Sequence, residues 1–87
     1  MAFVYILRSL KDSKKYIGST INLEQRLKQH NSGQVMSTKQ RRPLKLIGYQ
    51  YFETIEEAAL FEKRYKRSHN WLLRMIKAGK VITLDGM

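Results

Sequence analysis

The chain has 87 residues, which is enough for one small domain but not for two. Its 17 Lys and Arg outnumber its 7 Asp and Glu, and the resulting net charge of +10 favours a polyanionic partner such as nucleic acid over a basic protein without a special partner. Because it lacks cysteine and any apolar run near the roughly 20 residues of a membrane span, we exclude disulfides, thiol catalysis and membrane insertion and expect a cytoplasmic protein.

The first part of the chain predicts a β-hairpin followed by a helix. Phe3–Leu7 is aromatic and β-branched, and Lys15–Gly18 has the same character after a polar turn, so both are expected to be strands. Asn22 is a good N-cap for a helix over Leu23–Asn31. Gly33 suits the end of that helix.

The second part predicts a strand and two helices. In chain order we expect a polar loop over 34–43, a strand over Leu44–Phe52, a helix over Ile55–Ser68 and a short helix over Trp71–Ala78. Thr54 and Glu57 form a capping box for the longer helix, and Asn70 is the expected cap of the shorter one. Val81–Leu84 should be extended or loosely packed. The order is ββαβαα, an α+β fold with a small three-stranded, mainly antiparallel sheet flanked by helices, in a single domain over 1–87.

The hairpin register decides where two tyrosines lie. If the turn is centred between Lys11 and Asp12, Tyr5 lies opposite Gly18 and Tyr16 lies next to it diagonally on the same face. A register change of one residue would move the tyrosines to opposite faces. Strand packing is the usual role of such tyrosines.

Glu62 is a charged residue in an apolar place. At about 100° per residue it falls within the apolar arc of its helix, between the small residues Ala58 and Ala59. A buried carboxylate needs a partner. The partner is either a divalent cation, which Mg²⁺ coordination by one carboxylate would allow, or one of the 17 Lys and Arg side chains.

Arg26 and His30 are one turn apart on the first helix and can reach the same ligand. Arginine matches phosphate oxygens, and histidine can move a proton near neutral pH. The alternative is an ordinary surface Arg and a half-buried His. The other histidine, His69, is interpreted as a helix-end residue.

Together these residues resemble the GIY-YIG endonuclease superfamily, in particular its small single-domain bacterial members. The resemblance comes from Val4-Tyr5-Ile6, Tyr16-Ile17-Gly18, Arg26 on the next helix and Glu62 on a later one, and it covers Phe3 to about Trp71. Phe3 stands where the family's first motif has glycine, but the tyrosine of that motif is kept.

The resemblance implies a metal-dependent endonuclease that hydrolyses phosphodiester bonds, with DNA favoured over RNA and a setting in DNA repair or recombination. Glu62 would hold one Mg²⁺ or Mn²⁺, and Arg26 would neutralise charge on the phosphate. Tyr16 is favoured to take the proton of the attacking water, with His30 as the alternative and Tyr5 orienting. Asn31 would assist by hydrogen bonding.

Basic residues near these positions are expected to hold the nucleic-acid backbone. They are Lys39, Arg41 and Arg42 in the loop, and Lys63, Arg64, Lys66 and Arg67 on the Glu62 helix. Trp71 could stack on a base, although a lone Trp is more often a core residue. Two other functions stay open: a binding module that reuses the nuclease fold without cutting, and a structural protein of a ribonucleoprotein particle.

Overall fold

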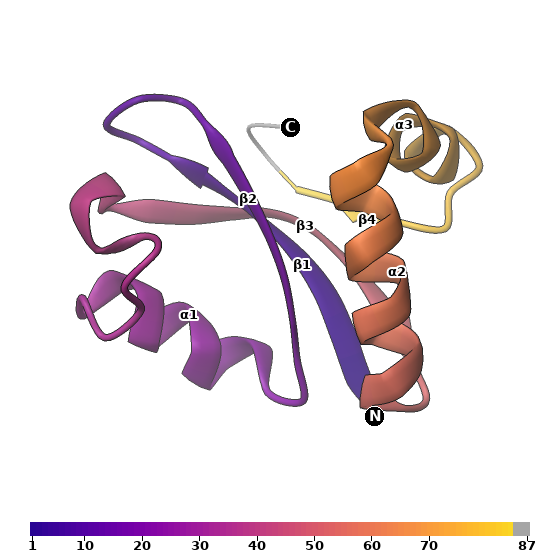
Figure 1. Ribbon diagram of the computed structural model, residues 1–87, viewed down its shortest axis with the longest axis horizontal. Coiled ribbons are helices and arrows are strands. Elements are labelled where there is room, and N and C mark those ends of the chain that lie inside the picture. Colours follow the sequence, from indigo (N-terminus) through magenta and orange to yellow (C-terminus); the bar gives the residue numbers. More distant parts are fainter. Residues whose placement is uncertain (85–87) are drawn as a thin grey trace.

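The computed structural model describes residues 1–84 and has a four-stranded antiparallel sheet at its centre (Figure 1). Its elements are β1 (Ala2–Ser9), β2 (Lys15–Thr20), α1 (Leu23–Asn31), β3 (Leu44–Phe52), α2 (Ile55–Arg67), α3 (His69–Lys77) and β4 (Ile82–Thr83), with one short 3-10 turn (Lys39–Arg41) in the predicted loop. The strand order is β2-β1-β3-β4, so β2 is an edge strand. The α+β class is confirmed, but the sheet has four strands rather than the predicted three.

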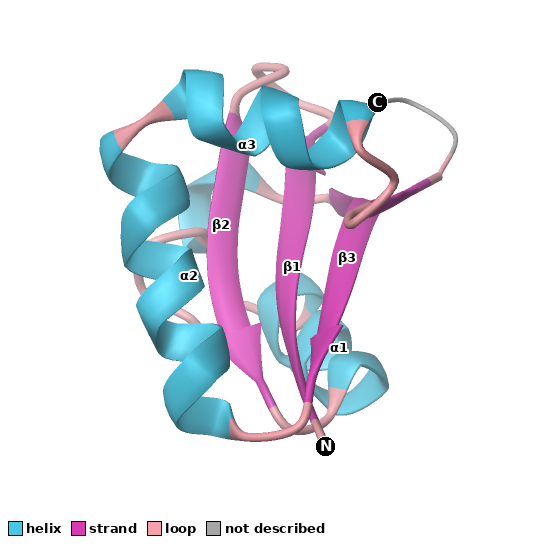
Figure 2. Ribbon diagram, turned by 90° about the vertical axis from the view of Figure 1, so that its right-hand side faces the viewer, coloured by secondary structure: helices cyan, strands magenta, loops and turns pink. Residues whose placement is uncertain are grey.

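Alternation along β1 divides the core between the two faces of the sheet. Val4 and Ile6 pack with residues of α2 and α3 in the larger cluster. Tyr5 and Leu7 point to the other face, where the side chains of α1 cover them. Figure 2 shows α2 and α3 in front of the sheet and α1 behind it. The site residues of α1 and α2 therefore approach β1 and β2 from opposite sides.

The helix starts predicted from capping residues are confirmed for α1 and α2. The Asn22 side chain accepts a hydrogen bond from the Gln25 backbone N–H at 3.0 Å, and Thr54 accepts one from Glu57 at 3.2 Å. The predicted start of the third helix was wrong. Ser68, in extended backbone, both ends α2 and caps α3, and Asn70 lies within the helix. Because no Gly or Pro marks this break, the helical periodicity predicted an end for α2 that is one residue too late.

The segment after α3 is more ordered than the expectation of an extended or loosely packed tail. Gly79 adopts φ +77°, which lets the chain turn back, and Val81 is 4% exposed in the larger core cluster. Ile82–Thr83 then pairs with β3, and the Leu84 N–H bonds to the carbonyl of Ile47 at 2.9 Å. Two paired residues are too few to show alternation in a sequence. The end of the expected domain, 85–87, lies outside the described residues.

Candidate active site

The β1–β2 register places the two motif tyrosines on one face, as predicted. Tyr5 pairs with Gly18 and Leu7 with Tyr16. The Tyr5 and Tyr16 rings lie 6.3 Å apart between centroids, and both face α1. Tyr5 is 2% exposed, whereas Tyr16 is half-buried, so of the two rings Tyr16 is the more accessible to solvent.

Gly18 makes room for the Tyr5 ring. A Cβ atom at Gly18 would lie 2.4 Å from the Tyr5 hydroxyl oxygen and 2.5 Å from its Cζ. Such distances are far inside van der Waals contact, so no other residue fits here without moving the ring. The glycine of the second motif is thus explained by packing against the tyrosine of the first.

The Tyr5 hydroxyl contacts two other residues of the site, Arg26 and His30. The Arg26 Nε–H donates to it at 3.3 Å, and it lies 2.9 Å from His30 Nε2. Burial raises the pKa of Tyr5, with the hydrogen bond from Arg26 opposing that effect. The same hydrogen bond raises the pKa of Arg26. Arg26 also donates to Gln29 Oε1 at 3.0 Å, which fixes the guanidinium beside the tyrosine.

His30 is fully buried, and both of its ring nitrogens have partners. Nδ1 lies 2.7 Å from Thr38 Oγ1, and that hydroxyl is placed to donate to the Val35 carbonyl at 3.5 Å. Nδ1 is then the donor, which leaves Nε2 to accept the Tyr5 hydroxyl proton. Burial and the charge of Arg26 lower the pKa of His30 to about 4, so the ring is neutral at physiological pH. Thr38 was missed because nothing in a polar loop marks it as the partner of a histidine.

Glu62 reaches from α2 to the edge strand β2. The Ser19 hydroxyl donates to Oε1 at 2.6 Å, and the Lys66 ammonium donates to Oε2 at 2.7 Å. The Glu62 side chain is 21% exposed, and that of Lys66 is 48% exposed. Lys66 also lies 5.7 Å above the Tyr16 ring and so links the carboxylate to the tyrosines. Sequence reasoning assigned no role to Ser19.

The donor set at Glu62 suits one hard divalent cation. One oxygen is fixed by a serine, and the other is held only by a flexible, half-exposed lysine that a cation could replace. Mg²⁺ commonly uses one or two protein carboxylates and completes its shell with water and phosphate oxygens. Within residues 1–84 no cluster of three His, Cys, Asp or Glu side chains offers a fuller cage. The arrangement therefore fits a cation that shares its ligands with a phosphate.

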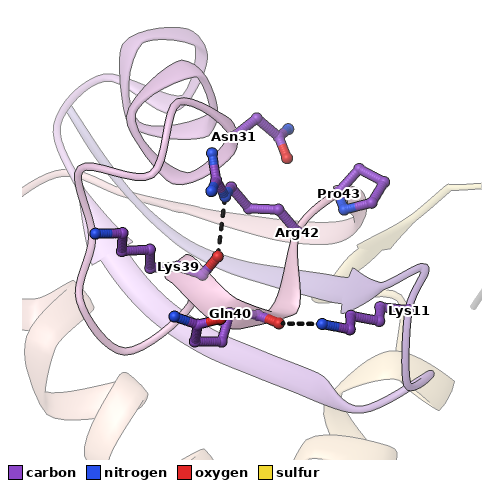
Figure 3. Close-up of a pocket in the computed structure, with 6 residues that line it drawn as sticks. All are labelled: Lys11, Asn31, Lys39, Gln40, Arg42 and Pro43. Carbon is purple, nitrogen blue, oxygen red and sulfur yellow. Dashed lines mark hydrogen bonds between the residues drawn. The ribbon is translucent and has the colours of Figure 1, made fainter.

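Lys39 and Arg42 line a polar hollow of about 380 Å³ with Lys11 (Figure 3). Lys11 Nζ donates to the Gln40 carbonyl at 3.2 Å, and Arg42 Nε donates to that of Lys39 at 2.9 Å. No carboxylate of residues 1–84 lines the hollow. Three exposed cations held together without an acid make a suitable contact for phosphate. Asn31, which also borders the hollow, instead ties α1 to β3. Its side chain donates to the Leu44 carbonyl at 2.9 Å and accepts the Leu44 N–H at 2.7 Å.

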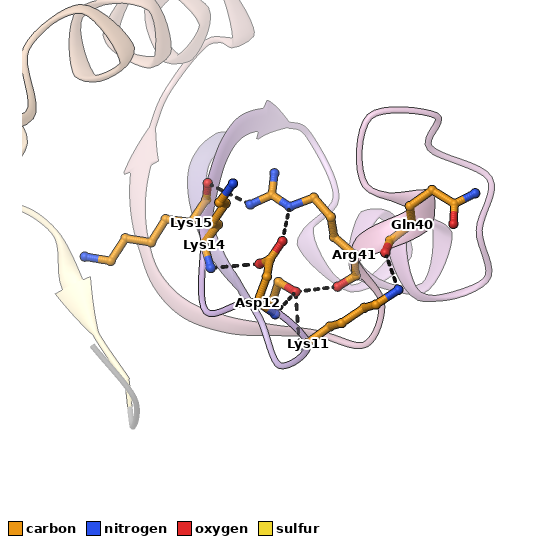
Figure 4. Close-up of polar contacts among 7 residues, drawn as sticks. Lys11, Asp12, Lys14, Lys15, Gln40 and Arg41 are labelled. Carbon is orange, nitrogen blue, oxygen red and sulfur yellow. Dashed lines mark hydrogen bonds and ion pairs between the residues drawn. The ribbon is translucent and has the colours of Figure 1, made fainter.

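Arg41 differs from its neighbours because it has an acidic partner (Figure 4). Its Nε lies 3.5 Å from Asp12 Oδ2, and its carbonyl accepts the Ser9 hydroxyl at 2.7 Å. A hydrogen bond from the Lys14 backbone N–H lowers the pKa of Asp12. These contacts join the loop to the β1–β2 turn, which gives Arg41 a structural role.

The basic residues of α2 have different partners. Lys66 binds Glu62, whereas the Arg64 guanidinium stacks on Phe61 at 5.4 Å and on Trp71 at 5.5 Å. Trp71 packs against the larger core cluster, as expected for a lone Trp in a small domain.

In the described part of the chain no helix is long and apolar enough to cross a membrane.

The chain is similar to a known catalytic-domain family and to several bacterial proteins. The family model of the GIY-YIG catalytic domain matches residues 1–74. The UPF0213 protein CPE1444 of Clostridium perfringens is 39% identical over 83 residues, which cover 93% of this chain and 88% of the relative. The UPF0213 protein spr1390 of Streptococcus pneumoniae is 42% identical over 67 residues, covering 76% of this chain and 67% of the relative. The solution structure of the UPF0213 protein BH0048 from Bacillus halodurans is 31% identical, with a TM-score of 0.52 over 92% of this chain and 87% of that one.

Proposed function

The chain belongs to the GIY-YIG catalytic domain family, and on that premise we propose that it is a metal-dependent endonuclease that hydrolyses phosphodiester bonds. The observation that carries the proposal is the Tyr5 hydroxyl, which contacts a cation for phosphate, Arg26, and a neutral proton acceptor, His30. Glu62 is near enough for its charge to raise the pKa of both Tyr5 and Arg26 further. Packing alone would require one hydrogen-bond partner for a buried tyrosine hydroxyl, whereas this hydroxyl has two, a cation and a neutral base.

Arg26 neutralises the phosphate in this mechanism. Its guanidinium is half-buried and fixed by Tyr5 and Gln29, and it carries positive charge at any physiological pH. A group held in place before the reaction stabilises the charge that develops on a pentacovalent phosphate without reorganising. A cation held by Glu62 would supply Lewis-acid stabilisation of the same charge and of the leaving 3′ oxygen.

Tyr5 and His30 move the proton of the attacking water. Tyr5 receives that proton on its oxygen while its own proton passes to His30 Nε2, so no free phenolate forms against the raised pKa of Tyr5. His30 receives the proton only through Tyr5, because its Nε2 is hydrogen-bonded to the Tyr5 hydroxyl. Tyr16 is the other candidate base; it is more exposed, and Lys66 lies above its ring.

DNA is the first substrate to test, with products that carry a 5′ phosphate and a 3′ hydroxyl and a setting in cytoplasmic repair or recombination. The assay is nicking of supercoiled plasmid with Mg²⁺ or Mn²⁺, with and without chelator. Glu62→Gln, purified identically, keeps the acceptor for Ser19 and removes the charge. We expect the wild type to nick only with metal and the variant not to nick.

Equal nicking by both proteins would show that the activity comes from a contaminant and not from this chain. A wild type that binds plasmid, branched DNA and RNA but cuts none of them would favour the binding module instead. Tyr5→Phe and Tyr16→Phe, assayed side by side, separate the two candidate bases.

A further inference from the structure

Helices α2 and α3 meet at a corner (Figure 2). Cations and an aromatic ring form a second surface there. A hollow of about 310 Å³ there is lined by Arg64, Arg67, Ser68 and Trp71. The hollow exists because Ser68 interrupts the two helices and turns the chain. It is separate from the tyrosines and the carboxylate described above.

Trp71 forms a rigid wall of this hollow. Its ring is half-buried and packs against Phe61 at 5.5 Å and Tyr65 at 5.7 Å between centroids. Its backbone N–H is bound by the Ser68 side chain at 3.2 Å, which fixes the start of α3. A ring held in this way loses little entropy when a flat ligand stacks on it.

Among the described residues, the cations of the hollow have no acidic partner. Within residues 1–84 the ion pairs are Arg41–Asp12 and Lys66–Glu62, so Arg64 and Arg67 are not neutralised by a carboxylate in this range. The Arg64 guanidinium stacks on Trp71 at 5.5 Å, so a base that stacks on the same ring face must displace it. A flat aromatic ligand with an attached anion would satisfy the ring and both charges at once.

A basic band joins this hollow to Glu62 around the exposed side of α2. At about 100° per residue, the angles from Glu62 around the helix axis are about 40° for Lys66, 100° for Lys63, 140° for Arg67 and 200° for Arg64. All four side chains are exposed. A polyanion that leaves the carboxylate would therefore meet cations continuously until it reaches Trp71.

We propose that the α2–α3 corner binds an unpaired strand of nucleic acid, with a base stacked on Trp71 and adjacent phosphates on Arg64 and Arg67. The proposal rests on the function proposed above, because the strand is the one that continues from the phosphate held near Glu62. A duplex fits the surface poorly. Its bases hide their faces, and with a persistence length of about 150 bp it does not bend around a helix of roughly 10 Å diameter. The substrate class is thus single-stranded or branched nucleic acid with an unpaired arm.

Trp71 is the one tryptophan of the chain, so its fluorescence reports on this site directly. The test uses the Glu62→Gln chain, which we expect not to cut, titrated with oligothymidine of about ten nucleotides. We expect saturable quenching. Stacking of one base is worth about 1–3 kcal/mol, so its loss corresponds to roughly 5- to 150-fold in affinity. Arg64→Gln and Arg67→Gln should each weaken binding several-fold, whereas Arg74→Gln, which removes an exposed arginine of α3 outside the hollow, should not.

Several results would overturn the proposal. Oligothymidine that binds by anisotropy without changing Trp71 fluorescence would place the strand elsewhere. Equal effects of Arg64→Gln and Arg74→Gln would show that binding depends on the overall positive charge and not on this hollow. Equal quenching by a duplex or by polyglutamate would refute the proposed ligand class. Trp71→Phe, which keeps a ring in the core, should weaken anisotropy-detected binding. Quenching without any cutting of plasmid, branched DNA or RNA by the wild type would refute the nuclease but keep this site, and cutting of any of them without quenching would do the reverse.

Discussion

Substituting Gly18 by alanine tests the link between the two sequence motifs. The new Cβ would lie 2.4 Å from the Tyr5 hydroxyl, while ordinary contact begins near 3.4 Å, so ring or strand must move by about 1 Å. Tyr5 is 2% exposed and its hydroxyl has two polar partners, so the ring has no free space to enter. Overpacking of this kind costs about 1–3 kcal/mol.

For a domain of this size each kcal/mol lowers Tm by about 4–8 °C, so we expect Gly18→Ala to unfold at least about 4 °C earlier in thermal melts followed by circular dichroism. The nicking rate should fall about 100-fold, since a misplacement of 1 Å is enough for a loss of that size.

The Tyr5→Leu background provides the control, because leucine lacks the atoms that the new Cβ would meet. There Gly18→Ala should be neutral or stabilising by about 0.4–1 kcal/mol, the usual effect of a less flexible unfolded chain. Tyr5→Phe should not rescue, since its Cζ would still be 2.5 Å away. The reasoning is refuted if Gly18→Ala keeps the wild-type Tm and rate, or if it costs as much beside leucine as beside tyrosine.

Three further predictions concern His30, Glu62 and the basic loop. Between pH 6.5 and about 4 the unfolded chain binds a proton on His30 that the folded chain does not. The free energy of unfolding should therefore decrease, by at most about 3 kcal/mol, as the pH is lowered through this range. Urea unfolding of His30→Gln should lack this pH dependence. Ser19→Ala should lower the nicking rate but not nucleic-acid affinity, because it frees the Glu62 carboxylate to rotate; a parallel loss of affinity would contradict this role. Arg42→Gln should reduce the salt dependence of DNA binding by about 0.9 per lost phosphate contact, whereas Arg41→Gln should lower Tm and leave the salt slope unchanged.

The sequence by itself determined the elements whose signals are local. The capping side chains of Asn22 and Thr54 predicted two helix starts. A turn centred between Lys11 and Asp12 predicted the pairing of Tyr5 with Gly18, and the structure has that register rather than the alternative shifted by one residue. These features depend on residues within a few positions of each other or on one hairpin. The same locality explains the misplaced start of α3, where Ser68 serves two helices at once.

Tertiary structure decided what each functional side chain touches. Helical periodicity showed that Glu62 needs a partner, but Ser19 is 43 residues away and its contact depends on how α2 packs against β2. Likewise the sequence placed His30 beside Arg26, and only the fold of the loop over it sets its neutral, buried state through Thr38. Charge counting could not separate Arg41, which is held by Asp12, from Arg42, which is free to meet phosphate. The residue types predicted the chemistry of the site. The hydrogen-bond and ion-pair partners of each side chain depend on burial and on contacts between residues distant in sequence, which arise only when the chain packs.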